Sequence, residues 1–171
     1  MRTIESCSRP EFVAGIHEED KFARQYFLKH ADEDRLWAST WGCFEDGVLA
    51  GAIALRTVYG KNSYYNIKLL TTFKRFEKKG IGRDLCRFAF TRAYKEGVKY
   101  FRISANPDAV EFYRKVGFKF WGKQRSGCSL SMFLINGALI ENGVYLRDPY
   151  IETCLTKGIM GSCVELYDRP S

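Results

Sequence analysis

The sequence predicts a single α/β or α+β domain, with a mixed sheet flanked by helices. The chain has 171 residues, about the size of one domain. Hydrophobic residues make up 46% and charged residues 27%, values that exclude a disordered or collagen-like chain. Segments with strand character lie on both sides of a long amphipathic helix. Such a crossing helix joins two parallel strands, so at least one pair in the sheet is expected to be parallel.

The first part of the chain is predicted to be helical. Ser8 and Glu11 have the spacing of a capping box, and Pro10 suits the first turn. We expect one or two helices that end near Asp34. The apolar residues of this segment recur at helical spacing: Phe12, Val13, Ile16, Ala23 and Phe27.

Three strands are predicted next. Residues 37–44 and 48–59 are rich in branched and aromatic residues, and Asp46-Gly47 between them favours a tight hairpin turn. Residues 64–73 form the third predicted strand, and the cluster Lys78-Lys79-Gly80-Ile81-Gly82 follows it.

The second half alternates helices and strands. A helix is predicted from Gly82 to Gly97, with apolar residues on one face and arginines elsewhere. A strand over 98–105, a short helix over 106–116 and two closing strands, 118–121 and 128–135, are expected after it. Residues 136–171 are glycine-rich and form a C-terminal extension, predicted to pack on the domain of residues 1–135.

The net charge of +7 is concentrated in one segment. Residues 74–102 contain ten Lys and Arg against Glu77, Asp84 and Glu96, which gives +7, so the rest of the chain sums to zero. Such a segment could face a nucleic acid, a single polyphosphate ligand or solvent.

The six cysteines form no C-x-x-C pair, and His17 and His30 are the two histidines. We therefore expect no metal site and no disulfide framework, but reduced thiols, with a nucleophilic thiol as the lesser alternative. Residues 1–6 lack the apolar core of a signal peptide, and no uncharged run is long enough to cross a bilayer. The expected location is cytoplasmic.

The loop before the basic helix fits a polyphosphate. Gly80 and Gly82 would let a ligand approach the backbone closely, and the helix dipole would favour an anion. No Gly-x-x-x-x-Gly-Lys-Ser/Thr motif occurs, and Leu85 stands where a dinucleotide fingerprint has its third glycine.

A second motif follows the basic helix. It runs Asn106-Pro-Asp-Ala109-Val-Glu-Phe112-Tyr113-Arg-Lys-Val-Gly117-Phe118, 26 residues beyond Gly80. Together with residues 78–82, it resembles the GNAT superfamily of acyl-CoA N-acyltransferases, from about Trp37 to Ile135. Glu77 departs from the pattern, because the family normally has Arg or Gln there.

This resemblance implies a GNAT-like central mixed sheet, splayed in the middle, with acetyl-CoA as the co-substrate in the cleft and no metal. Tyr113 would be the general acid that protonates the departing thiolate. The implied cofactor-binding residues are the pyrophosphate turn (Lys78, Lys79, Gly80, Ile81, Gly82, Arg83), the strand that bonds the pantetheine and the acyl carbonyl (Leu70, Thr71, Thr72), and Asn106 on the pantetheine arm.

No general base is obvious on the strands. Asn66 and Lys68 occupy the strand where the family often has a glutamate. The remaining candidates lie on turns and helices, and for each of them a solvated surface group is the more economical interpretation. These candidates are Glu45, Asp46, His17 and His30.

Three functions stay open. The chain could acetylate the primary amine of an unidentified acceptor, act on nucleic acid such as an aminoacyl-tRNA or a base, or bind CoA without catalysis. The C-terminal extension could cover the acceptor side of the cleft, form a homodimer contact or cover a sheet edge.

Overall fold

The computed structural model describes residues 1–30, 34–58, 64–96, 100–105, 109–116, 119–120, 122–124, 130–135, 140–141, 144–145 and 164–166. The chain divides into two compact units. The first contains Met1–Arg56 and Ile67–Arg92, and the second contains Thr57–Asn66 and Ala93–Ser171. None of the described helices is long and apolar enough to cross a membrane.

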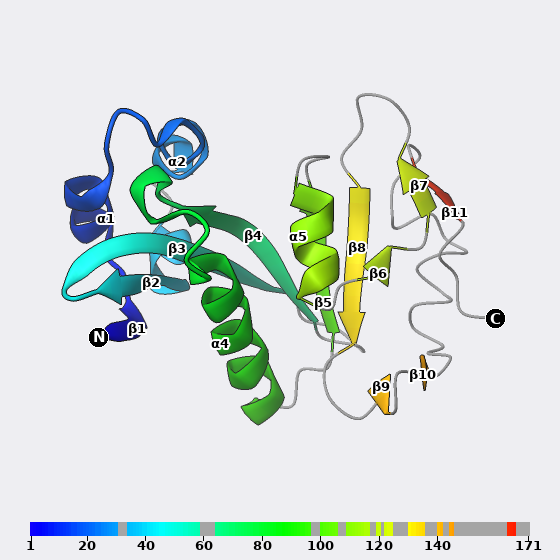
Figure 1. Ribbon diagram of the computed structural model, residues 1–171. Helices are drawn as coiled ribbons and strands as arrows, with labels where there is room; N and C mark the ends of the chain where they lie inside the picture. Colours follow the sequence, from blue (N-terminus) through cyan, green and yellow to red (C-terminus); the bar gives the residue numbers. More distant parts are fainter. Residues whose placement is uncertain are drawn as a thin grey trace. The chain divides into compact units, whose positions relative to one another are not determined.

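The strands that lie wholly or mostly in the first unit follow the order β1-β2-β3-β4 (Figure 1). They are β1 (Arg2–Ser6), β2 (Thr40–Glu45), β3 (Val48–Val58) and β4 (Tyr64–Thr72). The pairs β1–β2 and β2–β3 are antiparallel. Asp46 and Gly47 join β2 to β3 with φ of 48° and 82°, which confirms the predicted hairpin. β1 was not among the strands that the sequence predicts.

Short helices precede this hairpin. They are α1 (Arg9–Gly15), α2 (Lys21–Tyr26), a 3-10 helix (Leu28–His30) and α3 (Asp34–Ala38). The capping box of Ser8 and Glu11 is present and begins α1, as predicted. Two α-helices, α1 and α2, lie before Asp34, as expected, and a 3-10 helix follows them. Trp37 belongs to α3, so β2 begins at Thr40 instead of the predicted residue 37.

An aromatic core joins these helices to the end of β4. The rings of Phe12 and Phe27 stack with centroids 4.7 Å apart, and Phe12 meets Phe73 at 5.6 Å. Phe73 directly follows β4, and its N–H donates to the Ala50 carbonyl on β3 at 2.8 Å. The last residues of β4 are therefore fixed by a fully buried neighbour.

Helix α4 (Ile81–Lys95) confirms the predicted amphipathic helix. Its buried positions include Ile81, Leu85 and Ala89. Phe88 meets Trp41 of β2 with ring centroids 5.7 Å apart, so α4 packs on the sheet of the first unit.

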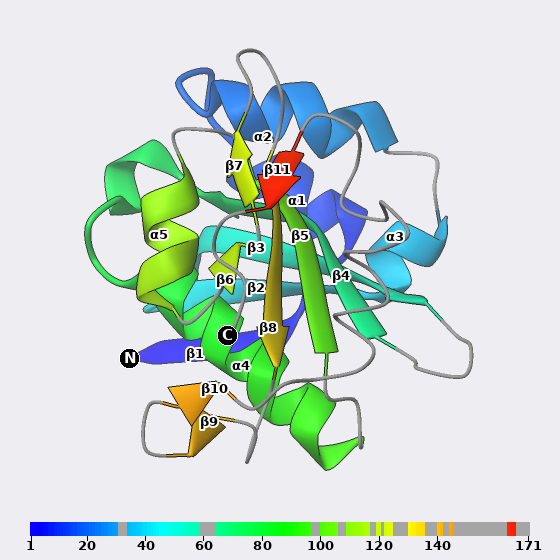
Figure 2. The ribbon, with the colours of Figure 1, turned by 90° about the vertical axis from the view of Figure 1, so that its right-hand side faces the viewer.

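The second unit supplies the parallel pair. The first residues of β4, Tyr64–Asn66, pair in parallel with β5 (Tyr100–Ala105) through Asn66↔Arg102. Beyond that last pair, β4 continues to Thr72 and β5 to Ala105. β8 (Leu130–Ile135) lies antiparallel beside β5, and β6 (Lys119–Phe120) beside β8 (Figure 2). The sheet is thus mixed, as predicted.

Helix α5 (Val110–Lys115) lies within the predicted short helix, whose first residues, 106–108, fall outside the described part of the chain. The extension contains β9 (Ile140–Glu141), β10 (Val144–Tyr145) and β11 (Val164–Leu166). β9 pairs with β10, and β11 pairs with β7 (Gly122–Gln124), a strand that the sequence did not predict. The division into residues 1–135 and 136–171 stays a prediction.

Candidate functional site

A strained turn leads into α4. Lys78 and Gly80 both have left-handed backbone conformations, with φ of 61° and 79°. For Lys78 this conformation costs roughly 1–2 kcal/mol. The Asp84 N–H donates to the Gly80 carbonyl at 3.0 Å, and this is the first hydrogen bond of the helix. The N–H groups of Ile81, Gly82 and Arg83 therefore lie in the first turn, where helix geometry offers them no acceptor.

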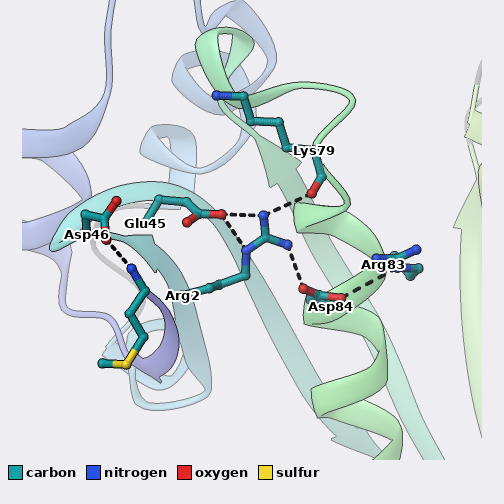
Figure 3. A network of polar contacts seen from close by, with 7 residues as sticks. Arg2, Glu45, Asp46, Lys79, Arg83 and Asp84 are labelled. Carbon is teal, nitrogen blue, oxygen red and sulfur yellow. Dashed lines mark hydrogen bonds and ion pairs between the residues drawn. The ribbon is translucent and has the colours of Figure 1, made fainter.

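Arg2 of β1 holds this turn from one side (Figure 3). Its Nη2 donates to the Lys79 carbonyl at 2.9 Å, and its Nη1 donates to Asp84 Oδ2 at 2.6 Å. Its Nε donates to Glu45 Oε1 at 2.5 Å. The hydrogen bonds to Asp84 and Glu45 raise the pKa of Arg2.

Phe76, in the 3-10 helix Lys74–Phe76, packs against the hydrophobic core, and two cationic side chains lie over its ring. Arg75 Cζ lies 5.3 Å and Lys79 Nζ 5.4 Å from the ring centroid, within cation–π range. Arg75 also donates to the Gly15 carbonyl. Lys78 and Arg83 are exposed beside the turn.

The end of β4 lies close to β3. A Cβ added at Gly51 would stand 2.5 Å from the Thr71 carbonyl oxygen, so only glycine permits this approach. Thr71 is buried, whereas Leu70 and Thr72 are half-buried. Thr71, Thr72 and Glu77 line a cavity of about 230 Å³, together with residues Glu19, Asp20, Lys21, Phe22, Ala23 and Lys74.

Asp20 is a structural member of that lining. It is 6% exposed, and its two oxygens accept from the backbone N–H groups of His17 and Lys74, each at 2.8 Å. This carboxylate therefore fixes the loop before α2 to the residue that begins the 3-10 helix.

Tyr113 lies on α5 in the second unit. Its side chain is 6% exposed, and its ring meets that of Phe112 edge-on with centroids 5.1 Å apart. Asn106 lies outside the described residues.

Two of the four candidates for a general base are engaged elsewhere. Glu45 is paired with Arg2, and the hydrogen bond from the N-terminal amine lowers the pKa of Asp46. His17 lines a second cavity, with Glu18 and Glu19. His30 ends the 3-10 helix after α2. Asn66 and Lys68 both lie on β4, and both are half-buried.

The described cysteines are free and buried. Burial raises the pKa of Cys7 and Cys86 to about 12 and that of Cys43 to about 11. A thiolate is the nucleophilic form of cysteine, so these three are poor nucleophiles at neutral pH. Among the residues that the structure describes, no group of His, Cys, Asp and Glu could hold a metal ion.

The chain combines a mixed sheet, which contains the parallel pair β4–β5, with a turn that leads into the N-terminus of α4. The model of the acetyltransferase (GNAT) family matches residues 1–118, and the chain belongs to this family. No curated protein sequence matches the chain.

Solved structures share this fold. The PaiA N-acetyltransferase from Thermoplasma acidophilum, in complex with coenzyme A, is 20% identical, with a TM-score of 0.59 over 79% of this chain and 99% of that one. Ard1 from Thermoplasma volcanium is 18% identical, with a TM-score of 0.61 over 80% and 98%. The N-acetyltransferase YlbP of Bacillus subtilis, in complex with coenzyme A, is 17% identical, with a TM-score of 0.55 over 79% and 97%.

One residue at the turn escaped the sequence reasoning. Arg2 precedes the Lys79 carbonyl that it binds by 77 positions. The sequence carries no signal for such a contact. Gly80 and Gly82 of the same turn were predicted, because a glycine pair between a strand and a helix is a local sequence pattern.

Proposed function

We propose that this protein is an N-acetyltransferase that transfers the acetyl group of acetyl-CoA to the primary amine of an acceptor. The observation that carries this proposal is the turn at residues 78–80, which leads into the N-terminus of α4 within a chain of the GNAT family.

The turn suits a pyrophosphate. Backbone N–H groups in the first turn of a helix are good anion donors, and the helix dipole adds favourable potential. Lys78 and Arg83 supply exposed positive charge at the same place. The cofactor-binding residues of this proposal are Lys78, Lys79, Gly80, Ile81, Gly82 and Arg83 for the pyrophosphate, Leu70, Thr71 and Thr72 for the pantetheine and acyl carbonyl, and Asn106 for the pantetheine arm.

Glu77 stands where the family normally has Arg or Gln, and its carboxylate would repel a nearby anion. This residue lines the cavity with Thr71 and Thr72, and it is exposed. Water therefore screens its charge, and the neighbouring cations offset it.

Tyr113 would act as the general acid. In acetyl transfer the amine nitrogen forms a bond to the thioester carbon, and the carbon–sulfur bond breaks as the tetrahedral intermediate collapses. The Tyr113 hydroxyl would donate its proton to the departing thiolate, while the amine loses a proton to solvent or to a base.

The test is to incubate the protein with acetyl-CoA and a mixed pool of amines, peptides and tRNA. Thiol release and the mass of each product are followed, with Gly82→Asp as the site variant. Acetylated amine from the parent, but not from the variant, supports the proposal. Acetylated nucleic acid would favour an enzyme that acts on nucleic acid. CoA binding without thiol release would indicate a module that binds CoA without catalysis. The cytoplasmic location stays a prediction.

A further inference from the structure

We infer that Arg2 is a positioning residue for the CoA site: by holding the Lys79 carbonyl and neutralising Asp84, it sets the turn in the orientation that binds pyrophosphate. This inference rests on the proposed function, since it assigns a role in the same site.

The first argument is the direction of the peptide group. In a trans peptide the carbonyl and the following N–H point in opposite directions. The Lys79 carbonyl points at the Arg2 guanidinium, 2.9 Å from Nη2. The Gly80 N–H therefore points away from Arg2, where its hydrogen bond is available to a ligand. If this peptide flipped, a carbonyl oxygen would replace the donor.

The second argument is backbone strain. Lys79 lies between two residues with left-handed φ, and one of them, Lys78, is not a glycine. Such a turn persists only when surrounding contacts hold it. The bond from Arg2 is such a contact, and it comes from another strand.

The third argument is charge. Asp84 lies in the first turn of α4, where its carboxylate would compete with a bound anion for the helix dipole. Arg2 binds Asp84 Oδ2 at 2.6 Å and so removes that repulsion. Glu45, on β2, fixes the guanidinium from the other side. All of these groups belong to the first unit.

The network is not simply a source of stability. The side chains of Arg2, Glu45 and Asp84 are 25%, 24% and 28% exposed, so the network is half-buried, and removal of Arg2 would leave two carboxylates without their partner. Loss of Arg2 should therefore lower the melting temperature as well as the affinity for CoA, and the comparison of CoA with pantetheine separates the two effects.

The experiment compares Arg2→Gln, Arg2→Lys and the control Arg9→Gln. Arg9 is an exposed arginine at the start of α1, so its variant removes the same charge without touching the turn. CoA and pantetheine, which lacks the pyrophosphate, are titrated by calorimetry. The KM for acetyl-CoA, kcat and the melting temperature are measured in parallel.

We expect Arg2→Gln to raise the Kd for CoA and the KM for acetyl-CoA about tenfold, the effect of one charged hydrogen bond. The kcat and pantetheine binding should stay near the parent values, whereas the melting temperature should fall because two half-buried carboxylates lose their partner. Arg2→Lys should recover part of the affinity, because an ammonium keeps the charge but cannot span the same acceptors. Arg9→Gln should match the parent.

Equal CoA affinity in Arg2→Gln and the parent would overturn the inference while leaving the proposed function intact. An equal loss for CoA and pantetheine, or a large fall in melting temperature with no fall in CoA affinity, would also overturn it. A parent that binds no CoA would overturn the proposed function itself.

Discussion

Gly51→Ala, a substitution on β3, should displace the end of the neighbouring strand β4. The new Cβ would lie 2.5 Å from the Thr71 carbonyl oxygen, 3.0 Å from Ile81 Cγ2 and 3.2 Å from Thr72 Cα. Two of these atoms are backbone and cannot rotate away. Return to ordinary contact near 3.4 Å requires the Thr71 oxygen to move by about 0.9 Å, which separates β3 from β4.

The expected cost is about 1–3 kcal/mol, the usual range for overpacking. For a chain of this size, each 1 kcal/mol lowers the melting temperature by about 2–4 °C. Thermal unfolding followed by circular dichroism should therefore show a fall of about 2–12 °C. Calorimetric titration should show weaker CoA binding as well, because Thr71 and Thr72 belong to the proposed pantetheine strand.

Gly47→Ala is the matched control. Gly47 has φ of 82°, and nothing lies within 4 Å of an added Cβ, so this variant carries backbone strain without a steric clash. It should lower the melting temperature and leave CoA affinity unchanged. If Gly51→Ala melts at the parent temperature and binds CoA equally well, the close approach of β3 and β4 has no bearing on the site.

Further predictions concern the second unit and the buried thiols. Tyr113→Phe should lower kcat about 10²–10⁴-fold with little change in CoA affinity, because the ring still packs while the proton donor is lost; an unchanged kcat with rate-limiting chemistry would make Tyr113 structural. Cys86 should react with iodoacetamide on the order of a thousandfold more slowly in the folded than in the denatured chain at pH 8, because burial raises its pKa from 9.0 to about 12; mass spectrometry would refute this if the two rates were similar. The contribution of that thiol to stability is complete below pH 9 and is lost as pH rises toward 12, which urea titrations at several pH values can follow. Truncation after Ile135 removes the strand that pairs with β7 and should lower acetyl transfer while CoA affinity is kept; full retention of folding, oligomeric state and rate would show that the extension serves none of them.

Local signals account for what the sequence predicted well. The Asp46-Gly47 turn, the capping box at Ser8 and the periodicity of α4 each depend on neighbours within a few residues. The turn at Gly80 was also recognised, since it combines glycines with a helix start.

Signals that depend on tertiary contacts were missed. Trp37 suits a strand by composition, but the structure places it in α3, where its ring packs 5.5 Å from Phe12. β1 is short and only half-buried at Arg2, Thr3 and Ile4, so its pattern does not stand out from a loop. Its function as a support for the turn depends on an arginine whose partners are distant in sequence.

The place of β1 in the strand order has a thermodynamic consequence. β1 is the terminal strand, bound through β2, and terminal strands open more readily than central ones. If Arg2 reaches the turn only while β1 is docked, then local opening of β1 and ligand affinity are linked equilibria. Linkage is reciprocal, so a bound nucleotide would slow amide hydrogen exchange in β1, a strand that it never touches.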